Sequence, residues 1–198
     1  MKRLFGLALT ALALWSAPVG AQAFKPGDPT LIPQAEAALR EIGIMTADFK
    51  FQNVAQINTG RLFVDRVGGR LRMEFDPPLS HLLVANGSRV DFIGGDGTIV
   101  NAGTQSTPLK LIFGKDASLS GDAEVLEIAV KGANAYFAVG DRTNPDQGKV
   151  ILHFERTKPI WTLHGWGFID PEGRYTKTVL SNRAFDVDLD ENLFVVDR

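Results

Sequence analysis

The clearest pattern in the sequence is an alternation of apolar and polar residues on both sides of the pair Gly68-Gly69. An alternation with a period of two is typical of a strand that is buried on one face only. The ranges 61–66 and 70–75 therefore predict two strands joined near the glycine pair. Their apolar residues, which we expect to share one face of the sheet, are Leu62, Val64, Leu71, Met73 and Phe75.

The same alternation places one charged residue on the apolar face. Arg66 follows Val64 by two positions, so its side chain points to the same side as the apolar residues of its strand. A guanidinium group is always charged, and its burial is costly unless acceptors hold it. Arg66 is therefore a candidate functional residue, although an arginine that only binds carbonyl groups at a strand end is the alternative explanation.

Two segments carry helical patterns instead. The segment from Asp28 to about Met45 has a capping residue, an early proline and an apolar stripe that includes Leu39, which predicts a long N-terminal helix. Thr107-Pro108 begins a shorter helical segment. That second segment is unusually apolar and contains Leu109, Leu111, Ile112 and Phe113.

Most of the remaining chain reads as strands. Short turns rich in Gly, Pro, Asn and Asp separate them, which favours antiparallel neighbours. The sum predicts a mainly β protein, in which roughly ten strands form a curved antiparallel sheet, close to a barrel, with helices over its open face. Beyond the hairpin, the predicted strands are 46–52, 82–85, 90–92, 98–101, 126–130, 135–139, 150–154, 160–169, 175–180 and 185–187.

The dipeptide Asn86-Gly87 has two interpretations. Between apolar runs it predicts a tight hairpin turn, because both residues tolerate positive φ. With Ser88 it also matches the acceptor sequence for N-glycosylation. The hairpin explains the residues without any modification, so we favour it.

The first 23 residues have the pattern of a cleaved secretory signal. Lys2 and Arg3 precede an apolar run that is too short to span a bilayer, and Ala21-Gln22-Ala23 resembles a cleavage site. A short membrane anchor is the alternative. We expect residues 24–198 to form a single exported domain, without a cysteine for lipid attachment.

Composition and motifs argue against several functions. Removal of Lys2 and Arg3 changes the formal net charge from −2 to −4, which disfavours binding to nucleic acid. The three histidines lack metal-ligand spacing, and no phosphate loop, dinucleotide fingerprint or nucleophile elbow occurs. The segment 186–190 resembles the start of a calcium loop, but Glu191 stands where that loop needs glycine. We expect no cofactor, no metal and no enzymatic activity.

The strands together present enough apolar residues for one continuous face. This face could be the packed core of a barrel, or it could line a cavity for an apolar ligand. A secreted protein with such a face and no catalytic motif suggests a carrier. The residues of the face are Phe49, Phe51, Leu62, Val64, Leu71, Met73, Phe75, Leu82, Val84, Val90 and Phe92.

The order of the motifs resembles the LolA family of periplasmic carriers of outer-membrane lipoproteins. The resemblance extends over essentially the whole chain after the leader. It rests most on Phe49–Gln52, Gly60–Arg66, Glu74–Pro78 and Thr107-Pro108. It implies an unclosed antiparallel barrel whose concave face takes up acyl chains beneath a helical lid. In the family an arginine at the end of the second strand holds the lid shut, and Arg66 matches it.

The resemblance also implies the rest of the site and the partners. Lid residues would be Leu39, Pro108, Leu109, Leu111, Ile112 and Phe113. The implied partners of this expected monomer are lipoprotein acyl chains, an inner-membrane ATP-driven release complex and an outer-membrane acceptor lipoprotein. The chain departs from the family pattern at Val67, where proline is usual, at an inserted glycine in Gly68-Gly69, and at Lys110 in the lid. A periplasmic sensor, or a carrier of another lipid or glycolipid, is the alternative.

Overall fold

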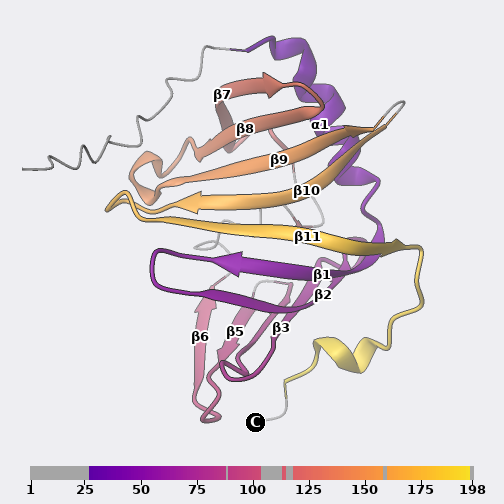
Figure 1. Cartoon of the computed structure of the whole chain (residues 1–198), viewed down its shortest axis with the longest axis vertical. Coiled ribbons are helices and arrows are strands. Elements are labelled where there is room, and N and C mark those ends of the chain that lie inside the picture. The colour runs from indigo at the N-terminus through magenta and orange to yellow at the C-terminus, as the bar shows by residue number, and fades with distance from the viewer. Residues whose placement is uncertain (1–26, 88, 104–112, 115–117, 158–159, 197–198) are drawn as a thin grey trace, which may run out of the picture.

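The computed structural model describes residues 27–87, 89–103, 113–114, 118–157 and 160–196. Their main feature is one antiparallel sheet of eleven strands in the order β6-β5-β4-β3-β2-β1-β11-β10-β9-β8-β7 (Figure 1). The strands are β1 (Ile44–Gln52), β2 (Ile57–Asp65), β3 (Arg70–Phe75), β4 (Leu82–Asn86), β5 (Arg89–Ile93), β6 (Ile99–Gly103), β7 (Ala123–Lys131), β8 (Asn134–Asp141), β9 (Lys149–Thr157), β10 (Ile160–Ile169) and β11 (Tyr175–Phe185).

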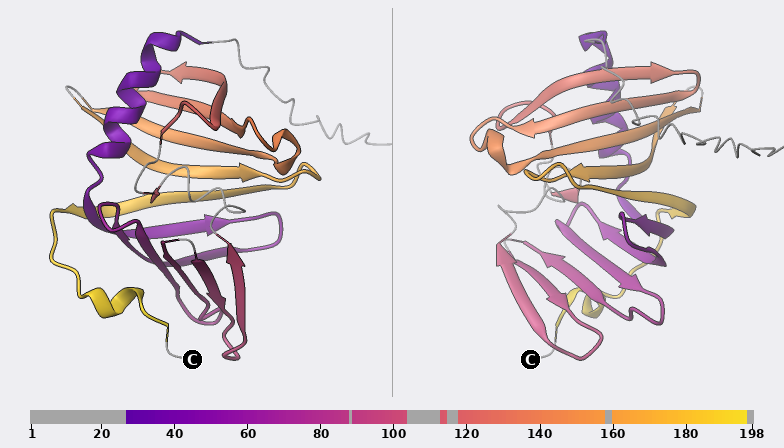
Figure 2. Two further views of the ribbon diagram at one scale, coloured as in Figure 1. Left: turned by 180° about the vertical axis from the view of Figure 1, so that it is seen from behind. Right: turned by 60° about the vertical axis from the view of Figure 1, so that its left-hand side comes forward.

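The sheet is strongly curved and does not close. β6 and β7 lie at its two ends, and in the described part of the chain each pairs with a single neighbour (Figure 2). The prediction of a mainly β, unclosed antiparallel sheet is therefore confirmed, with eleven strands where roughly ten were expected. The face against which α1 packs is called the concave face below, and the opposite face is the convex face.

The N-terminal helix is shorter than the sequence pattern predicts. Asp28 caps a 3-10 turn, η1 (Pro29–Leu31), by accepting a hydrogen bond from the Thr30 N–H at 2.9 Å, and α1 (Ile32–Arg40) follows. The predicted helix to about Met45 is wrong, because β1 already begins at Ile44. Gly43 takes a φ of +51°, which ends the helical run and turns the chain into the sheet.

The β2–β3 hairpin has a four-residue turn of residues 66–69. Across it Val64 pairs with Leu71, and Leu62 pairs with Met73, without a bulge. The glycine pair therefore leaves the predicted alternation intact, and both strands present their apolar residues to the concave face. Gly69 supplies the positive φ that closes the turn.

β4 faces the other way from the prediction. Leu82 pairs with Glu74 and Val84 pairs with Arg72, so Leu82 and Val84 lie on the convex face. The concave face receives Leu83 instead. An unbroken apolar run carries no alternation, so its sequence does not determine its face.

Two turns also differ from the prediction. Asn86 pairs with Arg89 as the last residue of β4, which confirms the tight hairpin. Gly87 has a φ of +60°, whereas Asn86 does not have the predicted positive φ. The predicted separate strand 185–187 is wrong. β11 continues to Phe185 through a bulge around Asn182, whose φ is +48°.

The C-terminal residues cross the convex face. The chain leaves β11, passes Asp186 and forms a short 3-10 helix, η4 (Glu191–Phe194), which packs on β3 and β4. Another short 3-10 helix, η3 (Pro145–Gln147), joins β8 to β9. Phe194 is buried there, as is Val84 on the same side of the sheet.

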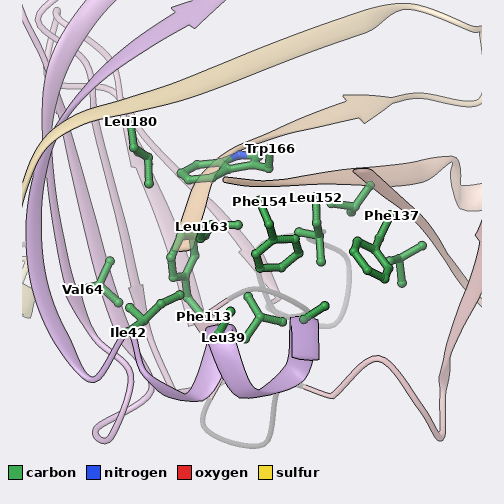
Figure 3. Packing of buried hydrophobic residues seen from close by; sticks show 14 of the residues in the cluster. Leu39, Ile42, Val64, Phe113, Phe137, Leu152, Phe154, Leu163, Trp166 and Leu180 are labelled. Atoms are coloured by element: carbon green, nitrogen blue, oxygen red, sulfur yellow. The ribbon is translucent and has the colours of Figure 1, made fainter. Parts of the chain in front are cut away.

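The core lies between α1 and the concave face. Leu39 and Ile42 project from α1 and its C-terminal end toward side chains of the sheet (Figure 3). Phe137 and Phe154 pack edge to face, with ring centroids 5.6 Å apart. The sheet contributes Phe137, Leu152, Phe154, Leu163, Trp166 and Leu180 to this view.

Candidate functional site

The concave face brings together nearly all the residues predicted to form the apolar cavity. Register explains the arrangement, because β1, β2 and β3 are neighbours and each turns alternate residues inward. Leu62 and Val64 are fully buried in the structure, with no exposed surface. The floor, defined by Phe49, Leu62, Val64, Leu71, Met73 and Val90, is buried throughout. In this structure the floor is therefore covered.

One end of the concave face is more open than the rest. Aromatic rings form a row there: the Phe75 ring centroid lies 5.0 Å from Phe49, 5.9 Å from Phe51 and 6.5 Å from His81. The row ends at Phe92, 5.0 Å from His81 and 36% exposed. We refer to Phe51, Phe75, His81 and Phe92 as the aromatic rim.

A glycine allows the inner end of this row to pack. Gly60 on β2 pairs with Phe75 and also lies beside Phe49. A Cβ atom at Gly60 would lie 2.5 Å from Cζ of Phe49 and 2.0 Å from the Glu74 carbonyl oxygen. The phenyl ring of Phe49 therefore occupies space that only glycine leaves free.

Two covering segments, helix α1 and the described residues 113–114 and 118–119, pack against the core cluster of the sheet, and α1 contacts β10. Leu39 of α1 is fully buried, and the Phe113 ring packs edge to face on Trp166 at 5.2 Å. A carboxylate ties the two covering segments together. Glu36 of α1 accepts hydrogen bonds from the Ser118 hydroxyl at 2.8 Å and from the Leu119 N–H at 3.0 Å. The sequence pattern gave no indication of this connection.

Arg66 is buried beside the floor, with 8% of its surface exposed. Its backbone N–H donates to the carbonyl of Gly43 at 2.9 Å, and Gly43 lies in the link from α1 to β1. The prediction that Arg66 points inward with Leu62 and Val64 agrees with this burial. Its role as a latch remains a prediction.

Part of the predicted lid lies outside the described residues. These are Pro108, Leu109, Leu111 and Ile112. The two lid residues that are described, Leu39 and Phe113, are both buried in the core cluster. The expected signal peptide, residues 1–23, also lies outside the described part.

The convex face over β8 to β11 is polar by comparison. Tyr136 stacks on His153 at 4.4 Å, and Nε2 of His153 lies 2.7 Å from Oδ1 of Asn134. Burial and the positive charges of His164 and Lys177 lower the pKa of His153 to about 4. His153 is therefore neutral near pH 7. A shallow hollow of about 60 Å³ beside it is far smaller than an acyl chain requires.

Two further features concern the described residues only. They contain no group of three or more His, Asp or Glu side chains placed to hold a metal ion. Their helices include none that is long and apolar enough to cross a membrane.

Comparison with solved structures places the fold. A LolA superfamily protein from Nitrosomonas europaea matches with a TM-score of 0.52 at 9% identity, over 84% of this chain and 96% of that one. MucB matches with a TM-score of 0.52 at 13% identity, over 87% of this chain and 65% of that one. A DUF1329 family protein from Desulfovibrio piger matches with a TM-score of 0.50 at 10% identity, over 84% and 95%. At such identities the likeness concerns the fold alone.

Comparison with protein families is more specific. No curated protein matches the sequence. The family model described as outer membrane lipoprotein carrier protein LolA matches residues 46–197, which contain all eleven strands except the first two residues of β1. The match covers well over half of the chain. The chain therefore belongs to the LolA family.

Proposed function

We propose that this protein carries lipoproteins from the inner to the outer membrane by sheltering their acyl chains on the concave face. The observation that carries the proposal is the apolar floor of β1 to β5, which is buried and shares most of its residues with the core cluster that also holds Leu39 and Phe113. LolA-family proteins are periplasmic and are described as lipoprotein carriers. We propose a periplasmic carrier without enzymatic activity.

The energetics explain why a carrier is needed. Each buried methylene group contributes about 0.8 kcal/mol, so three acyl chains of membrane length represent on the order of 30 kcal/mol of exposure to water. A lipoprotein cannot bear this cost in an aqueous compartment. The chain carries no nucleotide-binding loop. An inner-membrane ATP-driven complex would supply the energy for loading, and an outer-membrane lipoprotein would accept the cargo.

In such a carrier, the buried floor would belong to a closed form. Leu39, Phe113 and Leu119 are buried in the same core cluster as most of the floor, so they would have to move for an acyl chain to reach it. Loading therefore requires the cover to move away from the sheet. The aromatic rim is the end at which acyl chains would enter, because three of its four rings are phenyl groups and all four are at least partly exposed.

The direct test compares the acylated and non-acylated forms of one model lipoprotein. Each is mixed with the protein, and retention is measured by gel filtration. We expect only the acylated form to be retained. Equal retention of the two forms would refute the proposal and would favour a partner-binding sensor with the same fold.

A matched pair of variants tests the rim. Phe92 and Ile99 lie on adjacent strands, on opposite faces of the sheet, and are 36% and 40% exposed. Phe92→Asp places a charge at the proposed entrance and should weaken retention of the acylated protein. Ile99→Asp should leave retention unchanged, because its side chain faces away from the cavity.

Arg66→Leu tests the latch. Arg66 is buried, and its backbone bonds to Gly43 in the link after α1. If its side chain holds the cover, its loss should free the cover while the leucine side chain still fills the apolar site. We expect the variant to fold and to retain acylated protein but to deliver it poorly to acceptor membranes. Normal delivery would show that Arg66 has only a structural role.

A further inference from the structure

The turn that begins with Arg66 contains two adjacent glycines, Gly68 and Gly69. Gly68 and Gly69 have the largest backbone freedom of any residue type. Two hydrogen bonds close the turn: the Gly69 N–H donates to the Arg66 carbonyl at 3.2 Å, and the Gly68 N–H donates to Oδ1 of Asp65 at 2.8 Å. The order of this turn therefore depends on where the Asp65 carboxylate is held.

Arg70 holds that carboxylate from the other side of the turn. Nε of Arg70 donates to Oδ2 of Asp65 at 2.8 Å, and the two residues are paired across the strands. Gly68 makes room for this ion pair, because a Cβ atom there would lie 2.5 Å from Oδ2 of Asp65 and 2.7 Å from Nε of Arg70. Although burial opposes it, the bonds from Gly68 and Arg70 hold the pKa of Asp65 below its ordinary value. The pair is thus charged near neutral pH.

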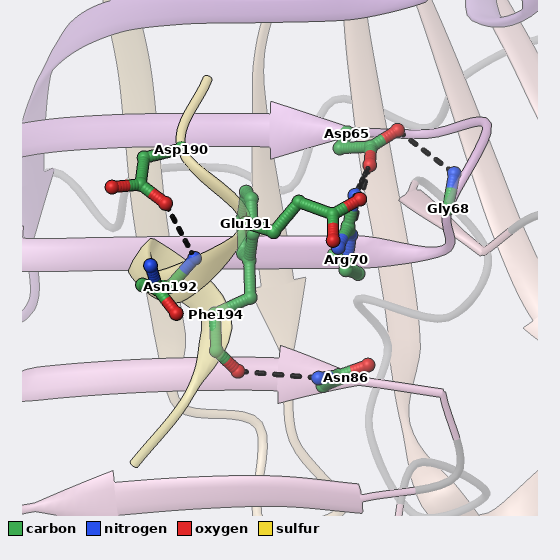
Figure 4. Close-up of polar contacts among 8 residues, drawn as sticks. All are labelled: Asp65, Gly68, Arg70, Asn86, Asp190, Glu191, Asn192 and Phe194. Atoms are coloured by element: carbon green, nitrogen blue, oxygen red, sulfur yellow. Dashed lines mark hydrogen bonds and ion pairs between the residues drawn. The ribbon is translucent and has the colours of Figure 1, made fainter.

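The C-terminal segment in turn holds Arg70. Its guanidinium carbon lies 5.0 Å from the centre of the Phe194 ring, within the range of a cation–π interaction. Oε1 of Glu191 approaches Nη2 of Arg70 at 3.7 Å. Figure 4 shows the bonds of Asp65 to Gly68 and Arg70, with the Glu191 side chain reaching toward Arg70. Phe194 is only 2% exposed, so its ring is a fixed surface for Arg70.

Other bonds anchor η4 independently of Arg70. Nη1 of Arg72 donates to the Leu193 carbonyl at 2.8 Å, and Nδ2 of Asn86 donates to the Phe194 carbonyl at 3.2 Å. Asp190 caps the short helix by accepting from the Asn192 N–H at 2.9 Å. The Phe194 backbone should therefore stay in place when its ring, or Arg70, is altered.

We propose that Phe194 is a positioning residue for Arg66. It acts through Arg70 and Asp65, which hold the glycine turn in place. The turn in turn fixes the backbone position of Arg66 and therefore where its side chain lies. This inference rests on the proposed carrier function for its consequence, but the coupling itself is a property of the fold. It connects a segment on the convex face to a group buried on the concave face.

Amide hydrogen exchange tests the coupling without any cargo. Phe194→Ala removes the ring, and Arg70→Lys keeps a positive charge but loses the planar fork that bonds and stacks. Both should raise exchange at the Gly68 and Gly69 amides by about fivefold to thirtyfold. Exchange in β9 and β10 should not change in either variant. Val195→Ala, at a neighbouring exposed position, is the control and should leave exchange at the turn unchanged. Unchanged exchange at both glycines would overturn the inference. If Phe194→Ala does not fold, Arg70→Lys decides.

Delivery assays with the acylated model lipoprotein test the consequence. Phe194→Ala should retain the cargo and lower its delivery, as Arg66→Leu does. In the Arg66→Leu background, Phe194→Ala should cause no further loss, because both changes remove one function. Independent, additive losses would mean that Phe194 is merely structural. If the wild-type protein retains both forms of the lipoprotein equally, the proposed function fails, and hydrogen exchange still decides the coupling.

Discussion

Leu62→Ala should weaken the cargo-free fold but strengthen cargo binding. Leu62 is fully buried at the centre of the floor, between Ala47 on β1 and Met73 on β3. The substitution removes three carbons, worth about 2.4 kcal/mol of burial, and leaves a cavity that adds to the loss. Met73 is flexible and can fill part of that cavity, so we expect a total loss of about 3 kcal/mol.

The same substitution should destabilise the cargo-loaded form less than the cargo-free form. A flexible acyl chain on the floor can occupy the space that the leucine vacates, whereas the covering side chains of the closed form are fixed by their own packing. If half of the loss is recovered, the difference of about 1.5 kcal/mol makes binding of a triacylated lipopeptide roughly tenfold tighter. The closed form thus competes with the cargo for the same surface.

The assay uses reporters already present in the cavity. Trp161 and Trp166 are both buried in the core cluster, so their fluorescence should follow unfolding in urea and titration with the lipopeptide. Arg61→Ala is the matched control, because Arg61 is the adjacent residue on the exposed face of the same strand. It should change stability and affinity little. Weaker or unchanged lipopeptide binding by Leu62→Ala would refute the reasoning.

Two further predictions concern stability. Gly60→Ala should destabilise the protein by about 3 kcal/mol or more in urea denaturation, because the new Cβ atom would lie 2.0 Å from a backbone oxygen of Glu74. The control Gly140→Ala should cost much less, because its Cβ atom would meet only the Leu126 side chain, at 3.1 Å. Similar losses of stability in the two variants would contradict the packing argument. For His153, the lowered pKa of about 4 means that the unfolded chain takes up a proton first, so stability should fall as the pH decreases from about 6.5 to 4. His153→Gln should remove this part of the pH dependence. If the urea midpoint of this variant changes with pH as it does in the wild-type protein, His153 is not the source.

The alternating strands could be predicted from the sequence because each has one buried face. The pattern around Leu62 and Met73 contains both the strand period and the side that faces the core, and the observed register agrees with it. The pattern did not predict the buried face of a strand where apolar and polar residues do not alternate. The run 82–85 is apolar throughout, so only its pairing with β3 decides that Val84 faces outward. The apolar stripe of α1 likewise continues past Arg40 into β1, and only the φ of Gly43 marks the change.

The polar connections of the site could not be predicted. Glu36 meets Ser118 and Leu119 across more than eighty residues, and Phe194 meets Arg70 from the opposite end of the chain. Such contacts leave no periodic signal, because a single side chain at each end suffices. The pairing of Asp65 with Arg70 is more local, since opposite charges at the two ends of a hairpin turn face each other across the strands.

The strand order has a consequence for folding. From β1 to β6, and again from β7 to β11, each strand pairs with its neighbour in sequence, whereas β1 and β11 join the two ends of the chain at the middle of the sheet. Loop closure costs little for the neighbouring pairs and most for this central one. Each half can therefore form as a separate meander. The pairing of Ile44–Gln52 with Tyr175–Phe185 should be the last part of the sheet to form.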